Sequence, residues 1–423
     1  MLQTTFIREN TALVIERLKK RNIDATSTVQ QIIDLDDKRK KTQQELDNLL
    51  AESNQIAKQV GNLFKSGKAA EANVLKERTV QIKEQSTVLK EEQNTIAVGL
   101  QQLLYQLPNL PNEIVPNGKS AEDNETVYTN NEIPTLHKGA LPHWELTKKY
   151  DIIDFELGVK ISGAGFPVYK GKGAQLQRAL ITFFLDEAIA AGYQEIMPPL
   201  MVNEASGYGT GQLPDKEGQM YYMPADDLYM IPTAEVPITN IYRDVILKES
   251  DFPIKNVGYT PCFRREAGSY GKDVRGLNRL HQFDKVEIVQ IQHPDKSYQT
   301  LDDMVEHVKS LLNKLELPYR ILRLCGGDMG FTSALTYDME VFSAAQEKWL
   351  EVSSISNFET FQANRLKCRY KDAEGKTQLV HTLNGSALAL PRILAAILEN
   401  NQTEKGIKIP ACLVPYTRFE YIN

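Results

Sequence analysis

Two uninterrupted hydrophobic repeats between about residues 27 and 104 restrict the fold of this chain more than any other feature. Apolar or small polar side chains recur there at alternating spacings of three and four, which is the 3.5-residue period of a coiled coil. The two runs cover residues 32–63 and 75–103, and glycines that can reverse the chain lie between them in residues 61–67. We therefore predict an antiparallel two-helix coiled coil whose helices are each about 50 Å long and project into solvent.

The predicted arm is electrically balanced, because residues 27–104 contain 11 Lys+Arg and 11 Asp+Glu. The net charge of −6 therefore belongs to the rest of the chain. Basic side chains gather at residues 38–41 and around the tip of the arm, at Lys58, Lys65, Lys68 and Lys76. They fit either a solvated coiled-coil surface or a rod that lies along a phosphate backbone and releases its counterions. Charge alone does not decide between these interpretations.

The composition is that of a globular protein, because 42% of the 423 residues are apolar and 25% are charged. No apolar run approaches the roughly 18 residues that a membrane-spanning helix needs. The four cysteines have no C-x-x-C spacing, which disfavours a disulfide framework and a zinc knuckle. We expect a cytoplasmic protein without membrane contact and without zinc.

The proline content and the hydrophobic pattern both change at about residue 106, which divides the chain there. Prolines are absent from both repeats but frequent in a connector over residues 107–120, and mixed strand-like and helix-like segments follow it. We predict an N-terminal helical domain over residues 1–106 and an α+β domain over residues 107–423, built on an antiparallel or mixed sheet. The expected helices are 174–191, 304–315 and 392–402, and the expected strands are 257–262, 285–291 and 320–323.

Common nucleotide and hydrolase motifs are missing from the sequence. No G-x-G-x-x-G follows a strand-like run, which argues against a Rossmann site. The stretch from Gly165 to Lys172 has one residue too many for a Walker loop, and Gly173 stands where that loop needs Ser or Thr. Neither H-E-x-x-H nor G-x-S-x-G occurs. Metallohydrolase and serine-hydrolase functions therefore have little support.

A different nucleotide site is indicated around residues 263–287. Phe-Arg-Arg-Glu at residues 263–266 precedes a glycine-rich loop, which a strand-like run follows. A strand–loop–strand would place Arg264 at the end of one strand and Phe283 on the next. Arginine can donate to two oxygens of one phosphate, and a phenylalanine ring offers a purine a stacking face. Taken singly, Phe283 fits a core residue and Arg265 a surface charge, but their combination predicts an ATP site.

Residues 260–287 resemble the second signature of class II aminoacyl-tRNA synthetases, and seryl-tRNA synthetases in particular. The resemblance extends over essentially the whole chain. It includes Met-Pro-Pro at 197–199 for the first signature, Thr-Ala-Glu at 233–235 and Glu-Val-Ser-Ser at 351–354 for the serine and ATP segments, and 382–386 with Pro391-Arg392 for the third signature. The N-terminal hairpin is similar to the family's tRNA-binding arm.

The resemblance implies a two-step reaction and its participants. L-Serine and ATP would form seryl-adenylate and pyrophosphate, and the seryl group would then pass to the 3′-terminal adenosine of tRNA(Ser), with tRNA(Sec) as a further candidate. The enzyme would be a homodimer that uses Mg²⁺. The serine contacts would be Thr233, Glu235, Arg264, Glu287, Thr382, Asn384 and Ser386. The ATP contacts would be Arg264, Arg265, Glu266, Phe283, Glu351, Val352, Ser353, Ser354 and Arg392.

Within these sets the resemblance implies distinct roles. Arg264 would bind the α-phosphate and the serine carboxylate, and Arg392 the γ-phosphate. These two arginines and Glu351 would be the catalytic residues, and Glu351 with Ser354 would hold Mg²⁺. Glu266 would bind the adenine amino group, and Phe283 would stack on the base. Pro391 stands where the family often has glycine, and we expect it in the first turn of a helix, where its missing N–H has no cost.

Two other functions compete with this interpretation. An amino-acid-activating paralogue that loads a carrier protein would keep the ATP residues but would be expected to lose the arm. A catalytically inactive scaffold would be expected to lose Arg264, Glu266, Glu351 or Arg392, all of which are present.

Overall fold

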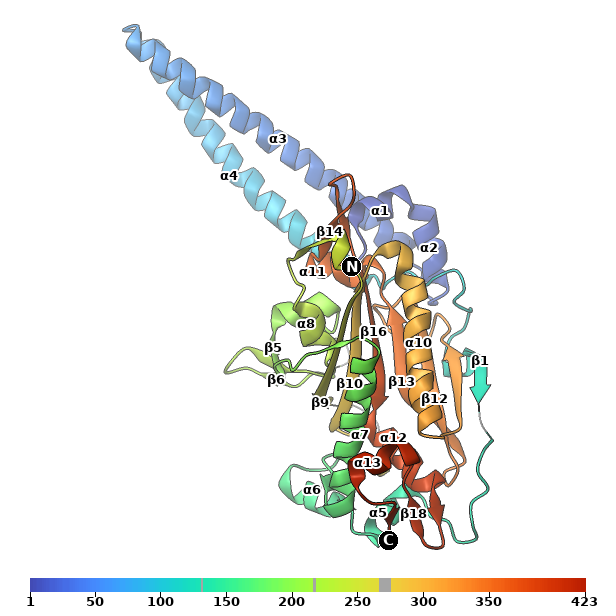
Figure 1. The fold of residues 1–423 in the computed structure, drawn as a ribbon. Coiled ribbons are helices and arrows are strands. Elements are labelled where there is room, and N and C mark those ends of the chain that lie inside the picture. Colours follow the sequence, from blue (N-terminus) through green and yellow to red (C-terminus); the bar gives the residue numbers. More distant parts are fainter. Residues whose placement is uncertain (131, 216–217, 266–274) are drawn as a thin grey trace. The chain divides into compact units, whose positions relative to one another are not determined.

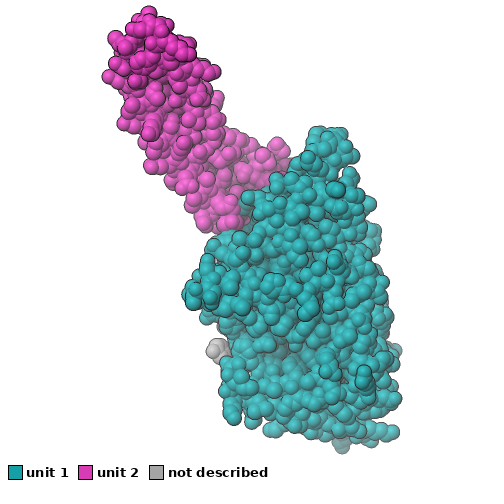
Figure 2. Space-filling view, turned by 60° about the vertical axis from the view of Figure 1, so that its left-hand side comes forward, with its two compact units in different colours: residues 1, 20–22, 109–423 teal, residues 2–19, 23–108 magenta. Residues whose placement is uncertain are grey.

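The structure is a computed structural model of the full chain and describes residues 1–130, 132–215, 218–265 and 275–423. These residues form two units, which Figure 2 shows in different colours. One unit comprises residues 2–19 and 23–108, and the other comprises residues 1, 20–22 and 109–423. Each unit is described separately.

The first unit is the predicted helical hairpin with two short helices before it (Figure 1). Its helices are α1 (Thr4–Glu9), α2 (Thr11–Lys19), α3 (Thr26–Lys65) and α4 (Ala69–Gln106). Every position of both predicted hydrophobic repeats is buried or half-buried, which confirms the register of the coiled coil. The 40 residues of α3 make it about 60 Å long, somewhat longer than predicted.

The turn of the hairpin is shorter than the sequence suggested. Gly61 lies inside α3, and the chain reverses only after Lys65, where Gly67 has a φ of +74°. The chain therefore reverses within the predicted residues 61–67, at the end of that range. One glycine in a left-handed conformation is enough to end the helix, and the other is tolerated within it.

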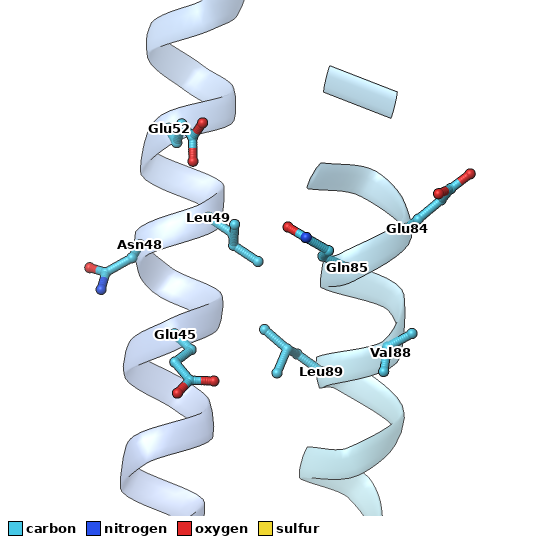
Figure 3. Close-up of a pocket in the computed structure, with 8 residues that line it drawn as sticks. All are labelled: Glu45, Asn48, Leu49, Glu52, Glu84, Gln85, Val88 and Leu89. Atoms are coloured by element: carbon cyan, nitrogen blue, oxygen red, sulfur yellow. The ribbon is translucent and has the colours of Figure 1, made fainter. Parts of the chain in front are cut away.

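A groove lies between α3 and α4 near the middle of the hairpin (Figure 3). Leu49 and Leu89 point toward each other across it, and its volume is about 610 Å³. Three carboxylates surround these two leucines, and none of the side chains that line the groove is basic. The lining residues are Glu45, Asn48, Leu49, Glu52, Glu84, Gln85, Val88 and Leu89.

An eight-stranded sheet organises the second unit, with the strand order β1-β11-β12-β13-β16-β10-β9-β4. All neighbours in it are antiparallel except β4 and β9. The strands are β1 (Glu125–Asn130), β11 (Tyr319–Arg323), β12 (Leu335–Ser343), β13 (Lys348–Asn357), β16 (His381–Ala389), β10 (Gln282–Gln292), β9 (Ile254–Phe263) and β4 (Gln194–Glu195).

Helices pack against this sheet and form the main core with it (Figure 1). The core takes apolar side chains from α7, α10 and α12, for example Phe184, Met304 and Leu394, all of which are fully buried. The helices of this unit are α5 (His143–Lys149), α6 (Phe155–Ile161), α7 (Gly171–Ala190), α8 (Glu204–Thr210), α9 (Glu235–Asn240), α10 (Ser297–Lys314), α11 (Thr360–Leu366), α12 (Leu390–Asn400) and α13 (Val414–Thr417).

Small sheets and short 3-10 turns complete the second unit. The sheets are β15-β14-β8 (Thr377–Leu379, Arg369–Lys371, Ile246–Lys248), β17-β18-β19 (Gln402–Thr403, Gly406–Lys408, Tyr421–Ile422), β2-β3 (Ile153–Asp154, Val168–Tyr169) and β5-β7-β6 (Met201–Asn203, Leu228–Met230, Tyr222–Met223). The 3-10 turns are Ala121–Asp123, Glu249–Asp251, Pro294–Lys296 and Ala411–Leu413.

The predicted α+β class, an antiparallel sheet flanked by helices together with a helical hairpin, is confirmed. All six predicted helices and strands are present, but α10 starts seven residues earlier than predicted, at Ser297. The buried residues of its first turn, Ser297 and Thr300, are polar, and Thr300 accepts a hydrogen bond from Gln292 (2.9 Å). This turn therefore lacks the apolar spacing that predicts a helix. Gln402 lies beyond α12, in β17. Pro391 stands in the first turn of α12, as predicted.

Within the described residues, none of the helices combines the length and the hydrophobicity that crossing a bilayer requires.

Candidate active site

The central strands carry most of the predicted site residues on one face of the sheet. Side chains two residues apart on a strand point to the same face, so Lys285 and Glu287 of β10 lie together. Thr382, Asn384 and Ser386 of β16 share a face for the same reason. The register pairs Glu287 with Ser386, which brings the two sets into contact. A local run of alternating polar residues thus becomes a polar surface inside the protein.

Glu287 is the centre of a buried polar cluster. Thr233, just before α9, donates a hydrogen bond to its Oε2 (2.5 Å), and Asn384 Nδ2 donates to its Oε1 (3.2 Å). The ammonium of Lys285 lies 2.6 Å from Glu287 Oε2 and 3.0 Å from Thr233 Oγ1. The Glu287 side chain is 1% exposed, so this pairing compensates a carboxylate that has almost no contact with water.

Glu235, the first residue of α9, adds a second carboxyl group to the buried polar cluster. Gln362 of α11 donates to its Oε1 (2.5 Å) and accepts a hydrogen bond from Thr382 (2.7 Å). Burial, followed by the nearby charge of Glu287, raises the pKa of Glu235 to about 7. Lys285 forms its ion pair with Glu287, whereas Glu235 is bonded to the neutral amide of Gln362, so Glu235 can accept an amino-acid ammonium.

Arg264 and Phe283 lie together where β9 and β10 meet. The register pairs Phe283 with Cys262, and the Arg264 backbone N–H donates to His281 O (2.9 Å), which extends the hairpin by one pair. The Arg264 guanidinium carbon is 5.3 Å from the centre of the Phe283 ring, and its Nε donates to Pro232 O (3.3 Å). Pro232 precedes Thr233, so this arginine adjoins the buried polar cluster.

Glu351 and Arg392 form a second pair. Arg392 Nη1 donates to the backbone oxygen of Glu351 (2.7 Å) and lies 3.6 Å from its carboxylate, while Arg392 Nε donates to Asn278 O (3.1 Å). Glu351 is exposed on β13, two strands from β10 in the order β13-β16-β10. Glu351 on β13 thus contacts Arg392 of α12, and Phe283 on β10 contacts Arg264, which follows β9.

Asp338 of β12 adds a carboxyl group that sequence reasoning missed. The register places it opposite Ser354, and one of its oxygens is buried without a hydrogen-bond partner among the described residues. Burial, followed by the charge of Glu351, raises the pKa of Asp338 well above its usual range. Asp338, Glu351 and Ser354 therefore offer neighbouring oxygen ligands. No group of three or more His, Cys, Asp or Glu that could hold a metal occurs in the described part of the chain.

The other predicted ATP contacts have different surroundings. Val352 packs in the core. Ser353 is buried and donates to Ser386 O (2.6 Å). Arg265 is exposed, with its guanidinium carbon 5.9 Å from the centre of the Tyr221 ring. Glu266 lies outside the described residues, as does the rest of 266–274.

Lys285, Gln362 and Asp338 are the site residues that the sequence did not reveal. Lys285 stands two residues before Glu287, so strand alternation within the second signature could have identified it. Gln362 and Asp338 reach the site through a helix and a strand pairing, and no local spacing marks them.

Comparison with known proteins agrees with this geometry. The family model described as the tRNA synthetase class II core domain (G, H, P, S and T) matches residues 222–401, and the Seryl-tRNA synthetase N-terminal domain matches residues 1–111. A serine–tRNA ligase of Salinibacter ruber is 50% identical, with 100% of this chain and 99% of that protein covered. One of Chlorobaculum parvum is 44% identical, with 100% of both covered.

Solved structures give the same result. The seryl-tRNA synthetase of Pyrococcus horikoshii complexed with ATP superposes with a TM-score of 0.92 at 34% identity, covering 100% of this chain and 99% of that one. The cytoplasmic enzyme of Naegleria fowleri in complex with AMP gives 0.88 at 26% identity, with 100% and 99% covered. The chain therefore belongs to the seryl-tRNA synthetase family of class II aminoacyl-tRNA synthetases, the ligases that attach serine to tRNA.

Proposed function

We propose that the buried polar cluster is the serine subsite of this serine–tRNA ligase. Lys285 pairs with Glu287 and leaves the buried Glu235 bonded to a neutral amide, and this is the observation that carries the proposal. The serine ammonium would pair with Glu235, and its hydroxyl would donate to Glu287. Thr233, Thr382, Asn384 and Ser386 line the same cluster, as the register and their hydrogen bonds indicate.

Such a subsite selects serine through its polar groups. Alanine or glycine would lack the hydroxyl that donates to Glu287, and a site built to bond a substrate hydroxyl can reject an analogue without it by on the order of 10⁴-fold. Threonine would have to be rejected by the volume of its extra methyl group. The expected result is slow pyrophosphate exchange with threonine, and rapid exchange at physiological concentrations would contradict it.

The neighbouring pairs would bind ATP. Arg264 would hold the α-phosphate and the serine carboxylate, because its guanidinium adjoins both the buried polar cluster and Phe283. Phe283 would stack on adenine, and Arg392 would hold the γ-phosphate. Arg265, Val352, Ser353 and Ser354 would line the remaining path of the nucleotide. The prediction that Glu266 binds the adenine amino group falls on a residue outside the description and stays a prediction.

Magnesium fits the oxygen ligands around Glu351. Mg²⁺ is a hard cation that prefers oxygen and usually retains several waters. Glu351 and Ser354 would hold it, and the unpartnered buried oxygen of Asp338 lies beside them. When bound, the ion would neutralise charge on the phosphates.

The first step needs no general base from the protein. The serine carboxylate has a pKa of about 3.5, so it is already ionised at neutral pH. Arg264 would align it with the α-phosphate, and Arg392 would hold the opposite end of the triphosphate. The protein therefore contributes positioning and stabilisation of charge on the transferring group.

The hairpin of α3 and α4 would bind tRNA(Ser). Recognition would act through phosphates and 2′-hydroxyls, which dominate contacts to double-stranded RNA. The domains would be 1–106 for RNA binding and 107–423 for catalysis. A homodimer is expected through the first signature, where Met197 is 89% exposed. A cytoplasmic location and activity on tRNA(Sec) remain predictions.

Deletion of the arm tests this division of labour. Removal of residues 27–104 should preserve serine-dependent ATP–pyrophosphate exchange and abolish charging of tRNA(Ser), because only the second step needs RNA. Arg264→Ala should abolish both activities. Full charging by the truncated protein would show that the hairpin is only structural. Absence of exchange in the intact protein would favour the inactive scaffold, and acylation of a carrier protein instead of tRNA would favour the paralogue.

A further inference from the structure

His143 and Glu399 form a fully buried pair that a series of hydrogen bonds connects to Arg392. Both side chains are 0% exposed, although 256 residues separate them along the chain. Glu399 Oε1 accepts hydrogen bonds from the His143 backbone N–H (2.8 Å), from His143 Nδ1 (2.6 Å) and from Gln346 Nε2 (2.8 Å), and Ser343 donates to Oε2. A carboxylate can accept about four hydrogen bonds, so Glu399 has a full set.

The other side of the His143 ring holds the segment that returns from the second-signature loop. The Leu277 backbone N–H donates to His143 Nε2 (2.8 Å). Nε2 must therefore be the acceptor, which assigns the ring proton to Nδ1, where it is donated to Glu399. Gly276 has a φ of +62°, and a Cβ there would come within 2.2 Å of His143 Nε2. Only glycine permits this close approach.

The next residue of the return segment connects the network to the site. Asn278 Nδ2 donates to Gln346 Oε1 (3.0 Å), and the backbone oxygen of Asn278 accepts from Arg392 Nε (3.1 Å). Glu399 thus fixes Gln346, Gln346 fixes Asn278, and Asn278 holds one edge of the Arg392 guanidinium. Glu351 O holds the other edge of that guanidinium (2.7 Å).

We propose that His143, Gln346 and Glu399 are positioning residues for Arg392, and that they act through the backbone of residues 277–278. The proposal rests on the function proposed above for Arg392. The network sets the orientation of the arginine before ATP arrives, so its loss weakens the grip on the triphosphate and leaves the serine subsite unchanged. A merely structural network would lower stability without separating the two substrates.

Gln346→Met is the most selective test, because Gln346 is half-buried and the substitution removes the link between Glu399 and Asn278 at nearly constant volume. Pyrophosphate exchange should show a KM for ATP about tenfold higher, as expected for one lost orienting hydrogen bond, with the KM for serine within about twofold of the parent value. Equal rises in both KM values, or an unchanged KM for ATP, would overturn the proposal.

Gln290→Met is the matched control. Gln290 is more buried than Gln346, and its substitution removes one hydrogen bond, from its Nε2 to the Tyr193 hydroxyl (2.7 Å). It lies on the face of β10 opposite Glu287. It should lower thermal stability to a similar degree and change neither KM. A KM for ATP that rises equally in this control would show that the effect of Gln346→Met is a general loss of stability.

Arg392→Ala separates failure of this proposal from failure of the proposed function. It should raise the KM for ATP by itself, and in its background Gln346→Met should have no further effect on that KM. No effect of Arg392→Ala would refute the role of the arginine. An effect of Arg392→Ala that adds fully to that of Gln346→Met would refute the positioning network.

His143→Gln, checked for folding by circular dichroism, should raise the KM for ATP as Gln346→Met does. A normal KM for ATP in a folded His143→Gln protein would count against the positioning role of His143.

Discussion

At the level of single residues, the proposed serine subsite depends on the balance between two carboxyl groups and one lysine. Glu287 is paired with Lys285, whereas Glu235 has Gln362 as its hydrogen-bond donor. Burial and the charge of Glu287 raise the pKa of Glu235 to about 7, far above the value near 4.3 of a free glutamate. Before the substrate binds, this carboxyl group is therefore partly protonated at neutral pH.

Serine binding should release a proton below neutral pH. Because the folded pKa is the raised one, the protonated form of Glu235 stabilises the free protein fully below about pH 4, and this contribution is lost as the pH rises toward about 7. The positive charge of the serine ammonium would favour the ionised form of Glu235, so the carboxyl group would lose its proton when serine binds. Calorimetry in two buffers of different ionisation enthalpy should find about one proton released per serine at pH 6 and about none at pH 8.

Glu235→Gln provides the control for this pH dependence. The amide keeps the shape of the side chain and cannot titrate, so the variant should release no proton at either pH and should bind serine more weakly at pH 8. Equal proton release at pH 6 by the parent protein and by the variant would refute the assignment to Glu235.

At the level of elements, the coiled coil contains one polar position that burial makes unfavourable. Ser86 of α4 is 6% exposed, and its hydroxyl has no hydrogen-bond partner among the described residues. The cost of desolvating such a hydroxyl is about 1 to 3 kcal/mol. Ser86 lies in the same stretch of α4 as Gln85 and Leu89, which line the groove between the two helices (Figure 3).

Ser86→Ala should therefore stabilise the hairpin. Native-state hydrogen exchange of α4 amides should show an opening free energy higher by about 1.5 kcal/mol, which combines removal of the buried hydroxyl with the better helix propensity of alanine. Thr87→Ala is the control, because Thr87 is exposed and bonded to Lys83 O (3.0 Å), so its gain should be about 0.5 kcal/mol. Equal increases in the opening free energy for Ser86→Ala and Thr87→Ala would show that burial of the Ser86 hydroxyl has no free-energy cost.

The elements also show what the sequence could and could not reveal. Periodicity identified the coiled-coil register correctly, because each seam residue needs only its partner helix to be buried. It missed the start of α10, where Ser297 and Thr300 are buried through hydrogen bonds and not through apolar contact. Motifs located Glu287 and Arg392, but the His143–Glu399 pair left no local signal, since residues so distant in sequence meet only after the sheet has formed.

At the level of the whole molecule, the two proposed activities differ in the charge of the substrates that they bind. On our proposal, adenylate formation would take place beside the buried polar cluster and would need only small substrates. Charging would in addition require a long polyanion on the hairpin. Lys38, Lys40 and Lys41 are engaged with Glu92, Asp36 and Glu45, whereas Lys58 and Lys65 near the tip are exposed.

Salt should therefore affect charging much more than activation. If about four phosphates are neutralised, raising monovalent salt from 50 to 200 mM should weaken tRNA binding about a hundredfold, because each released counterion contributes to the slope of log K against log salt. Pyrophosphate exchange should change by less than about threefold over that range, since it involves no polyanion. Measuring the KM for tRNA(Ser) and the exchange rate across the series compares the two directly. The double variant Lys58→Gln, Lys65→Gln should reduce the slope of log K against log salt for tRNA binding by about two and leave pyrophosphate exchange unchanged. Equal salt slopes for charging and for exchange in the parent protein would rule out the hairpin as the RNA contact.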